Sequence, residues 1–465
     1  SGTVTGVVAG TTNITYTLPT GCKATTGITV NAIPAAITGT PVMCVGGSVA
    51  LADATAGGAW SSSAVGTASV TATGVVTGVA AGNATISYTL ASGCYRTIVA
   101  TVNVVPTAIT GVTEVCVGST TALSNTVAGG TWSSTTTSIA SVNSATGVVT
   151  GVSAGTTTIS YRMGTGCQVT TVVTVDPLPA AITGTASVCI GSTTALSSTT
   201  AGGAWSSSTP AIGTVGAATG VVAGISAGNT VISYSLGTGC YVTKNVTVNP
   251  LPAAIGGTLT VCVSSTTTLT DATSGGAWSS STPSVASVGA GTGVVTGISG
   301  GVVNITYTLP TGCISTAAVT VNTLPATITG SSFVCFGLTT TFSDITAGGV
   351  WSSSNAAIAA VGTAGDVTGA GVGAATISYT LGTGCYVTKN ITVNPLPAAI
   401  GGAAVVCVGS TTTLTDATAG GVWSSGSTAV ASVTASTGVV TGIATGIANI
   451  TYLSLIHISE PTRPE

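Results

Sequence analysis

Tryptophan recurs along this chain at an almost constant interval of 72 or 73 residues. The six positions are Trp60, Trp132, Trp205, Trp278, Trp351 and Trp423. A fixed period of this size indicates one structural unit that is repeated, and it constrains the fold more than any other feature. An active site is usually assembled once from different residues. A chain that repeats one unit is therefore more typical of a structural or binding array than of an enzyme.

The segments between the tryptophans keep the same phase, and each repeat can be started at a proline. This alignment predicts five complete repeats and two partial ones. The complete repeats are residues 34–105, 106–178, 179–251, 252–324 and 325–396. Residues 1–33 hold the last strands of a preceding repeat, and residues 397–452 form an incomplete repeat. Residues 453–465 leave the pattern.

Each repeat is predicted to consist of short β-strands. In residues 230–236, apolar Ile232, Tyr234 and Leu236 alternate with serines, which is typical of a strand with one buried face. A glycine-containing turn separates this segment from residues 241–248, so the two are expected to form a hairpin. About seven short strands around one buried tryptophan describe an immunoglobulin-like sandwich. Solenoids and propellers need periods of about 20 and about 40–50 residues.

Several motifs in this repeat resemble those of the bacterial Ig-like domain, group 2. They appear as Gly130–Ser134, Ala140–Val142, residues 146–151 and residues 154–161. The V-x-P-L-P spacer and the paired cysteines are similar to versions in large Bacteroidota surface proteins. The resemblance covers residues 1–452 and implies an all-β tandem array of immunoglobulin-like β-sandwich repeats forming an elongated rod. It also implies an extracellular spacer or adhesin stalk, with no catalytic residues to carry over.

Charged side chains are very rare in this chain. They make up 3% of its residues, against roughly 25% in ordinary soluble proteins, and the net charge is −3. No basic patch could neutralise phosphates, which argues against nucleic-acid partners and against anionic membrane surfaces. The apolar stretches are broken by Gly and Thr before they reach the ~18 residues of a spanning helix, so no membrane span is expected in this fragment.

The twelve cysteines fall into two sets, and each set recurs with the period of the repeat. Six follow a glycine: Cys22, Cys94, Cys167, Cys240, Cys313 and Cys385. Six lie 22 residues further on: Cys44, Cys116, Cys189, Cys262, Cys335 and Cys407. Ser264 stands after Cys262 where the other repeats have glycine. Regular cysteines in such a chain indicate disulfides and an oxidising compartment.

Two pairings of these cysteines are open, and free or intermolecular thiols are a third alternative. An intradomain scheme would join Cys44 with Cys94 and Cys116 with Cys167. The expected topology places those cysteines at opposite ends of a sandwich, roughly 25 Å apart, whereas a disulfide needs Cα atoms within about 7 Å. We therefore favour interdomain pairs: Cys44 with Cys167, Cys116 with Cys240, Cys189 with Cys313, and Cys262 with Cys385.

The remaining candidate sites have simpler structural explanations. We expect the six tryptophans to be core residues rather than sugar-stacking platforms. Asp53, Asp271, Asp344 and Asp416 share one phase of the repeat but stand alone, so neither calcium nor another metal or cofactor is expected. The repeats contain no histidine to act as a general base, and the chain is predicted not to be an enzyme.

The last thirteen residues interrupt the repeat and carry the only histidine, His457. They resemble the translation of a sequencing adapter, and we interpret residues 453–465 as a non-native tail. His457 and Glu460 are given no functional role. The natural chain is then expected to be longer at both ends.

The sequence therefore predicts a secreted or cell-surface structural protein: a stalk, an adhesin spacer or a filament subunit. The expected partners are other copies of the chain or neighbouring surface proteins. The alternative is a glycan- or protein-binding adhesin module that uses loops at the sandwich ends. Nearly identical loops at residues 18–22 and 309–313 favour the spacer.

Overall fold

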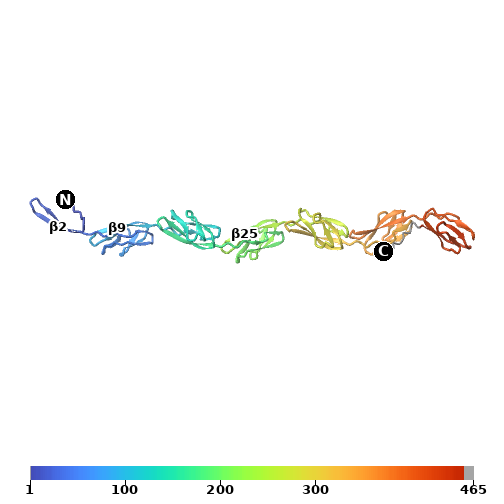
Figure 1. The fold of residues 1–465 in the computed structure, drawn as a ribbon, viewed down its shortest axis with the longest axis horizontal. Helices are drawn as coiled ribbons and strands as arrows, with labels where there is room; N and C mark the ends of the chain where they lie inside the picture. Colours follow the sequence, from blue (N-terminus) through green and yellow to red (C-terminus); the bar gives the residue numbers. More distant parts are fainter. Residues whose placement is uncertain (1, 455–465) are drawn as a thin grey trace. The chain divides into compact units, whose positions relative to one another are not determined.

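The computed structural model describes residues 2–454, and all regular structure among them is β (Figure 1). The chain divides into two compact units, Ser1–Val248 and Asn249–Glu465. Within each unit the strands form successive pairs of small sheets. The predicted all-β class, with tandem immunoglobulin-like sandwiches, is confirmed.

Residues 106–178 show how one repeat folds. Two four-stranded sheets face each other, with strand orders β10-β12-β15-β14 and β11-β17-β16-β13. The strands are β10 (Thr110–Gly111), β11 (Glu114–Cys116), β12 (Thr120–Ser124), β13 (Gly130–Ser134), β14 (Ala140–Val142), β15 (Val148–Gly151), β16 (Gly155–Met163) and β17 (Gln168–Asp176).

The final strand of the repeat, β17, is paired on both edges. It runs antiparallel to β16, in a register that sets Ile159 opposite Thr171. On its other edge it pairs in parallel with the three-residue strand β11, which sets Cys116 opposite Asp176. The last strand of the repeat is therefore a central strand of the sheet, and it joins β11 to β16.

The other repeats of the first unit keep this order. Within residues 2–33 the structure describes the hairpin of β1 (Gly10–Thr17) and β2 (Lys23–Val30). Residues 34–105 hold β3 (Val42–Cys44), β4 (Ser48–Ala50), β5 (Ala59–Ser62), β6 (Ala68–Val70), β7 (Val75–Gly78), β8 (Gly82–Thr89) and β9 (Tyr95–Asn103). Residues 179–251 hold β18 (Thr183–Gly184), β19 (Ser187–Cys189), β20 (Thr193–Ser197), β21 (Ala204–Ser207), β22 (Gly213–Val215), β23 (Val221–Gly224), β24 (Gly228–Ser235) and β25 (Tyr241–Asn249).

The second unit repeats the pattern and ends in a reduced set of strands. Residues 252–324 hold β26 (Gly256–Gly257), β27 (Thr260–Cys262), β28 (Thr266–Thr270), β29 (Ala277–Ser280), β30 (Ala286–Val288), β31 (Val294–Gly297), β32 (Gly301–Thr308) and β33 (Ile314–Asn322). Residues 325–396 hold β34 (Phe333–Cys335), β35 (Thr339–Thr341), β36 (Val350–Ser353), β37 (Ala359–Val361), β38 (Asp366–Gly369), β39 (Gly373–Thr380) and β40 (Tyr386–Asn394). After residue 396 come β41 (Thr411–Thr413), β42 (Gly421–Ser425), β43 (Ala431–Val433), β44 (Val439–Gly442) and β45 (Ile450–Ser454).

A separate apolar core lies between the two sheets of each repeat. In residues 106–178, β17 contributes Val173 and Val175, and β15 on the opposite sheet contributes Val149. These side chains are almost completely buried because the period-two alternation sends every second residue inward. Burial of one such side chain stabilises the fold by about 1.5–3 kcal/mol. Each sandwich thus has its own source of stability.

The repeat tryptophan packs against a tyrosine from the adjacent long strand. The ring centroids of Trp351 and Tyr379 lie 4.7 Å apart at an angle of 47°, and the other five pairs have nearly the same geometry. The Tyr379 hydroxyl donates to the carbonyl oxygen of Thr346 at 2.7 Å. It accepts the Gly349 backbone N–H at 2.9 Å. The tyrosine therefore ties the loop before the tryptophan to the core.

The second glycine of the G-G-x-W motif is explained by this contact. A Cβ atom placed on Gly349 would lie 2.4 Å from the ring of Tyr379, well inside van der Waals contact. Any side chain there would displace the ring that the loop is bonded to. The motif is therefore a packing requirement of the aromatic pair.

Ser264 occupies a turn position that is glycine in the other repeats. Its φ is 65°, and it is the only residue other than glycine with positive φ within residues 2–454. The matching position in the next repeat is Gly337, with a φ of 80°. A side chain in this left-handed region costs about 1–2 kcal/mol. The fold of the repeat therefore holds the backbone of Ser264 in a conformation that is unfavourable for serine.

Replacing Tyr379 by phenylalanine removes both hydrogen bonds of the hydroxyl but keeps the ring. We expect Tyr379→Phe to destabilise residues 325–396 by about 1–3 kcal/mol, because the Thr346 carbonyl and the Gly349 N–H lose a partly buried partner. Native-state hydrogen exchange of the β39–β40 amides measures this effect. The matched control is Tyr386→Phe in the same repeat, whose side chain is 58% exposed and should leave the exchange unchanged.

Ser264→Gly is expected to stabilise residues 252–324 by about 1 kcal/mol, since the strain released exceeds the entropy that glycine adds to the unfolded chain. The converse variant, Gly337→Ser, should destabilise its repeat by a similar amount. A Cβ atom at Gly337 meets no atom within 4 Å, so only the backbone conformation is tested. Both changes in stability can be measured by chemical denaturation in which the unfolding of each repeat is monitored by hydrogen exchange. Equal stability of Ser264→Gly and the parent chain would contradict this account.

Candidate functional site

The repeat tryptophans lie in the cores rather than on an open surface. Trp132, Trp205, Trp278 and Trp423 are 6–8% exposed, and Trp60 and Trp351 are partly buried. The tyrosine partner covers part of each indole. Little ring area is therefore left on which a sugar could stack.

Disulfides join several repeats to the repeat that follows. The structure pairs Cys44 with Cys167 (Cα atoms 5.8 Å apart), Cys116 with Cys240 (5.6 Å) and Cys262 with Cys385 (5.6 Å). Cys189 and Cys313 are also disulfide-bonded. The intradomain alternative is wrong for these cysteines, since neither Cys44 with Cys94 nor Cys116 with Cys167 is a bonded pair.

Local strand geometry brings the two sulfurs of a bridge together. Cys262 ends the short parallel strand β27 and lies opposite Asn322, the last residue of β33. Cys385 directly precedes the final strand of the next repeat, and its Sγ lies 3.9 Å from the Asn322 carbonyl oxygen. Both cysteines thus meet at the end of one final strand. The bridge connects the end of one sandwich to the turn of the last hairpin, β39–β40, in the next.

Four cysteines are free thiols in the structure: Cys22, Cys94, Cys335 and Cys407. Cys22 and Cys407 are exposed, while Cys94 and Cys335 are intermediate. Cys94 already has the geometry of a bridging cysteine, because its Sγ lies 3.8 Å from the carbonyl oxygen of Asn31, the residue that follows β2. It occupies the place that Cys385 takes beside Asn322.

The repeat aspartates are turn-forming residues. One carboxylate oxygen of Asp271 accepts the Thr273 backbone N–H at 2.7 Å, and the other oxygen is buried without a hydrogen-bond partner. Asn125 and Ser198 accept the matching N–H groups in their own repeats. Within residues 2–454, no group of three or more His, Cys, Asp or Glu side chains could hold a metal ion. An Asn or Ser can replace the carboxylate because the turn needs only an acceptor.

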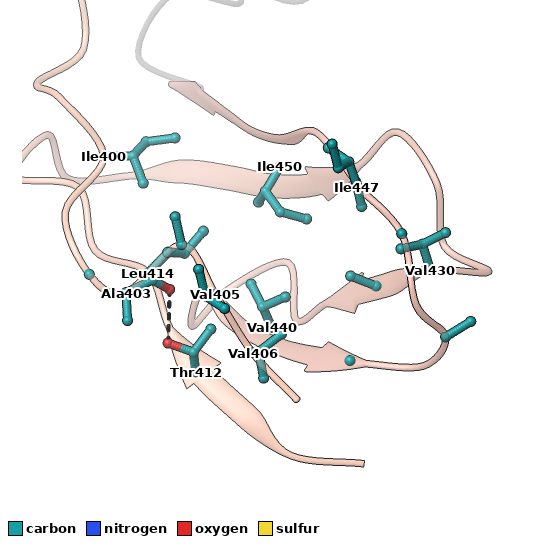
Figure 2. A pocket seen from close by; sticks show the side chains of 17 residues that line it. Ile400, Ala403, Val405, Val406, Thr412, Leu414, Val430, Val440, Ile447 and Ile450 are labelled. Carbon is teal, nitrogen blue, oxygen red and sulfur yellow. Dashed lines mark hydrogen bonds between the residues drawn. The ribbon is translucent and has the colours of Figure 1, made fainter. Parts of the chain in front are cut away.

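The incomplete repeat contains an open cavity of about 530 Å³ that is lined mostly by apolar residue types (Figure 2). Its lining includes Val406, Leu414, Val440 and Ile450. In Figure 2, Val406, Val440 and Ile450 point into the space between the two groups of strands. Sequence reasoning identified this repeat as incomplete but did not foresee the cavity. The signal was the missing final-strand pattern after Tyr452.

The bridges also indicate where the protein resides. Disulfides form and persist in oxidising compartments, and this protein is accordingly extracellular. Within residues 2–454 there is no helix with the length and hydropathy needed to cross a membrane.

No protein-family model and no curated protein matches the chain. Similar solved structures include a C-terminal 282-residue fragment of intimin in complex with the intimin-binding domain of its translocated receptor (19% identity, TM-score 0.23). The alignment covers 32% of this chain and 66% of the fragment, just under two thirds. The human desmocollin-1 ectodomain is 10% identical, with a TM-score of 0.16 and coverages of 78% and 98%. Domains 1–6 of the surface-layer protein SbsC are 16% identical, with a TM-score of 0.16 and coverages of 77% and 65%. These values are too low to carry a partner or an activity over to this chain.

Proposed function

We propose that this chain is a structural repeat region of an extracellular protein, acting as a stalk or adhesin spacer. The observation that supports this most is the covalent link between consecutive repeats, because a bridge such as Cys262 with Cys385 restrains orientation rather than building a site. The proposed domains are the repeats themselves, with the boundaries predicted from the sequence. Five complete domains and two partial ones of about 35–40 Å each would form a rod of roughly 200–280 Å.

The mechanical role of the bridges follows from where they attach. Consecutive domains joined by one peptide segment can rotate about it. A second covalent connection at the same junction removes most of that rotation. The connecting segments are also short and rich in proline, as in residues 395–397, which limits their backbone freedom. The proposed rod is stiff because each bridged junction is held at two points.

The surface chemistry suits a spacer. Charged side chains are 3% of the residues, so the surface is kept wet mainly by hydroxyl and peptide groups. Interactions between such groups change little with ionic strength, because salt screens charges. The proposed rod should therefore keep its properties over a wide range of salt concentration. With no histidine in any repeat, its protonation state also changes little near neutral pH.

The absence of chemical diversity between repeats argues against an enzyme, and we propose that the chain is not one. It also disfavours a binding module at the sandwich ends. The loops at residues 18–22 and 309–313 have the same sequence and close with the same backbone hydrogen bonds, from the N–H of the leucine to the cysteine carbonyl oxygen. Loops that recognise a ligand are expected to differ from copy to copy.

Removing one bridge tests the stalk directly. The double variant Cys262→Ser/Cys385→Ser should leave each sandwich folded but increase bending at the junction between residues 252–324 and 325–396. The 123-residue separation of the bridged cysteines predicts a loss of stability of about 2–4 kcal/mol. Negative-stain images of the parent chain should show a beaded rod, and the variant a rod with one additional bend.

The control is Cys22→Ser, which removes a cysteine that is free in the structure and should leave the images unchanged. A compact globule in the parent chain would refute the stalk. An identical distribution of bend angles in the double variant would refute the role of the bridge.

A further inference from the structure

The disulfide bridges of successive repeats overlap along the chain. The bridge between Cys44 and Cys167 closes a loop that contains Cys116. Cys116 begins the next bridge, which ends at Cys240 and closes a loop that contains Cys167. The two loops therefore share residues 116–167. The covalent structure of this region is interlaced, rather than a string of separate closed loops.

Overlap gives the backbone a second covalent route. A peptide bond inside a bridged loop is not the only covalent connection between its two sides. Every peptide bond from residue 44 to residue 240 lies inside at least one of the two loops, so one break there leaves the chain in one piece. Exposed loop tips are the preferred sites of proteolytic nicking, and the tip at residues 164–166 lies inside both loops.

The bridges also limit how far the chain can be stretched. The shortest covalent route from Cys44 to Cys385 crosses three bridges and contains two backbone segments, residues 116–167 and residues 240–262. These segments contain 51 and 22 residue steps. At about 3.3–3.6 Å per residue, the route spans roughly 270 Å with its bridges. The whole backbone between the same two cysteines would span roughly 1,200 Å.

Tension on this route acts along a final strand. Cys240 directly precedes β25, and the chain leaves the other end of this strand toward Cys262. The strand lies inside its sheet between β19 and β24, and it pairs with β24 through eight residues. Because the ladder hydrogen bonds are perpendicular to the strand, a pull along it loads them together rather than one after another. The strand that closes the sandwich is thus well placed to resist tension.

We propose that this protein bears tension along its chain. The overlapping bridges provide a covalent route that limits its length when repeats unfold and that stays continuous after a single break in the backbone. This function goes beyond the proposed stalk. A stalk needs junctions that do not bend, whereas a tether under tension needs limited extension and covalent continuity.

Pairing between consecutive repeats is what provides the second route. Intradomain pairs such as Cys44 with Cys94 would close each loop before the next one opens. Residues 94–116 would then be the only covalent connection between two repeats, and one break in them would separate the chain. The observed pairs enclose this segment, because the bridge from Cys44 ends at Cys167.

The lysines and arginines of the chain allow its covalent continuity to be tested without any substitution. The free thiols are alkylated in urea, and the unreduced chain is then digested completely with trypsin. Although the backbone is cut at Arg96 and Arg162, residues 24–244 should remain in one covalent assembly. Reduction should divide this region into three peptides, which mass spectrometry identifies as residues 24–96, 97–162 and 163–244.

Two other cleavage sites serve as internal controls. Lys23 and Lys389 lie outside the three loops, so residues 1–23 and the peptide after residue 389 should be released without reduction. Release of residues 24–96 before reduction would overturn the proposal, because no second route would then cross the junction that follows them.

Single-molecule stretching of the full chain, held at its two ends, tests the limit on length. The fully stretched chain should be roughly 900 Å longer after reduction with dithiothreitol. In the oxidised state, the double variant Cys44→Ser/Cys167→Ser should be roughly 70 Å longer than the parent chain, because the route must then use residues 44–116 in place of residues 116–167. Cys335→Ser removes a cysteine that is free in the structure and should leave the length unchanged.

An oxidised chain that stretches as far as the reduced one would contradict the proposed tether, and so would a double variant of the parental length. The stalk is judged on a different measurement, the bending of the folded chain in images. A flexible chain with limited extension would refute the stalk alone, and a stiff chain whose oxidised form stretches without this limit would refute the tether alone.

Discussion

The final strand of each repeat is the element on which the sandwich depends. It pairs with the preceding long strand along its full length and with the short parallel strand at its end, as β17 does with β16 and β11. It also contributes Val173 and Val175 to the core, each at most 1% exposed. Because the strand comes last in the repeat, the sheet cannot close until the whole repeat is available. Non-local pairings of this kind are costly in loop entropy until they are complete.

The bridges depend on the same strand. The parallel pairing places a cysteine beside the last residue of the final strand, as with Cys262 beside Asn322. The following repeat supplies the second cysteine in the turn of its own final hairpin, directly before its final strand. One strand thus sets both the closure of its own sandwich and the attachment of the next. A substitution that shifted its register would disturb the core and the bridge together.

The period, the strand alternation and the hairpins could be predicted because they are local. The pairing of three-residue strands such as β11 could not, since a short strand carries no signal for a partner about 60 residues away. The tyrosine hydroxyl was missed although its position was visible, 28 or 29 residues after each tryptophan. A tyrosine in a strand with period-two alternation is predicted to be a core residue. Only the structure reveals that the Tyr379 hydroxyl bonds to the Thr346 carbonyl oxygen and the Gly349 N–H. The sequence shows that Ser264 replaces a glycine of the other repeats, but the free-energy cost of this replacement depends on its φ of 65°, which only the structure gives.

Near-identity between repeats creates a pairing problem that the cysteines help to solve. Any final strand in this chain carries nearly the pattern of any other, so a sandwich can in principle accept the strand of a neighbour or of another copy. Within the chain, the short loop between the last two strands makes the correct partner the nearest one. A bridge such as Cys116 with Cys240 then forms only when both repeats have closed in register, because its two cysteines are positioned by two different final strands. The disulfide therefore selects the correct arrangement after folding.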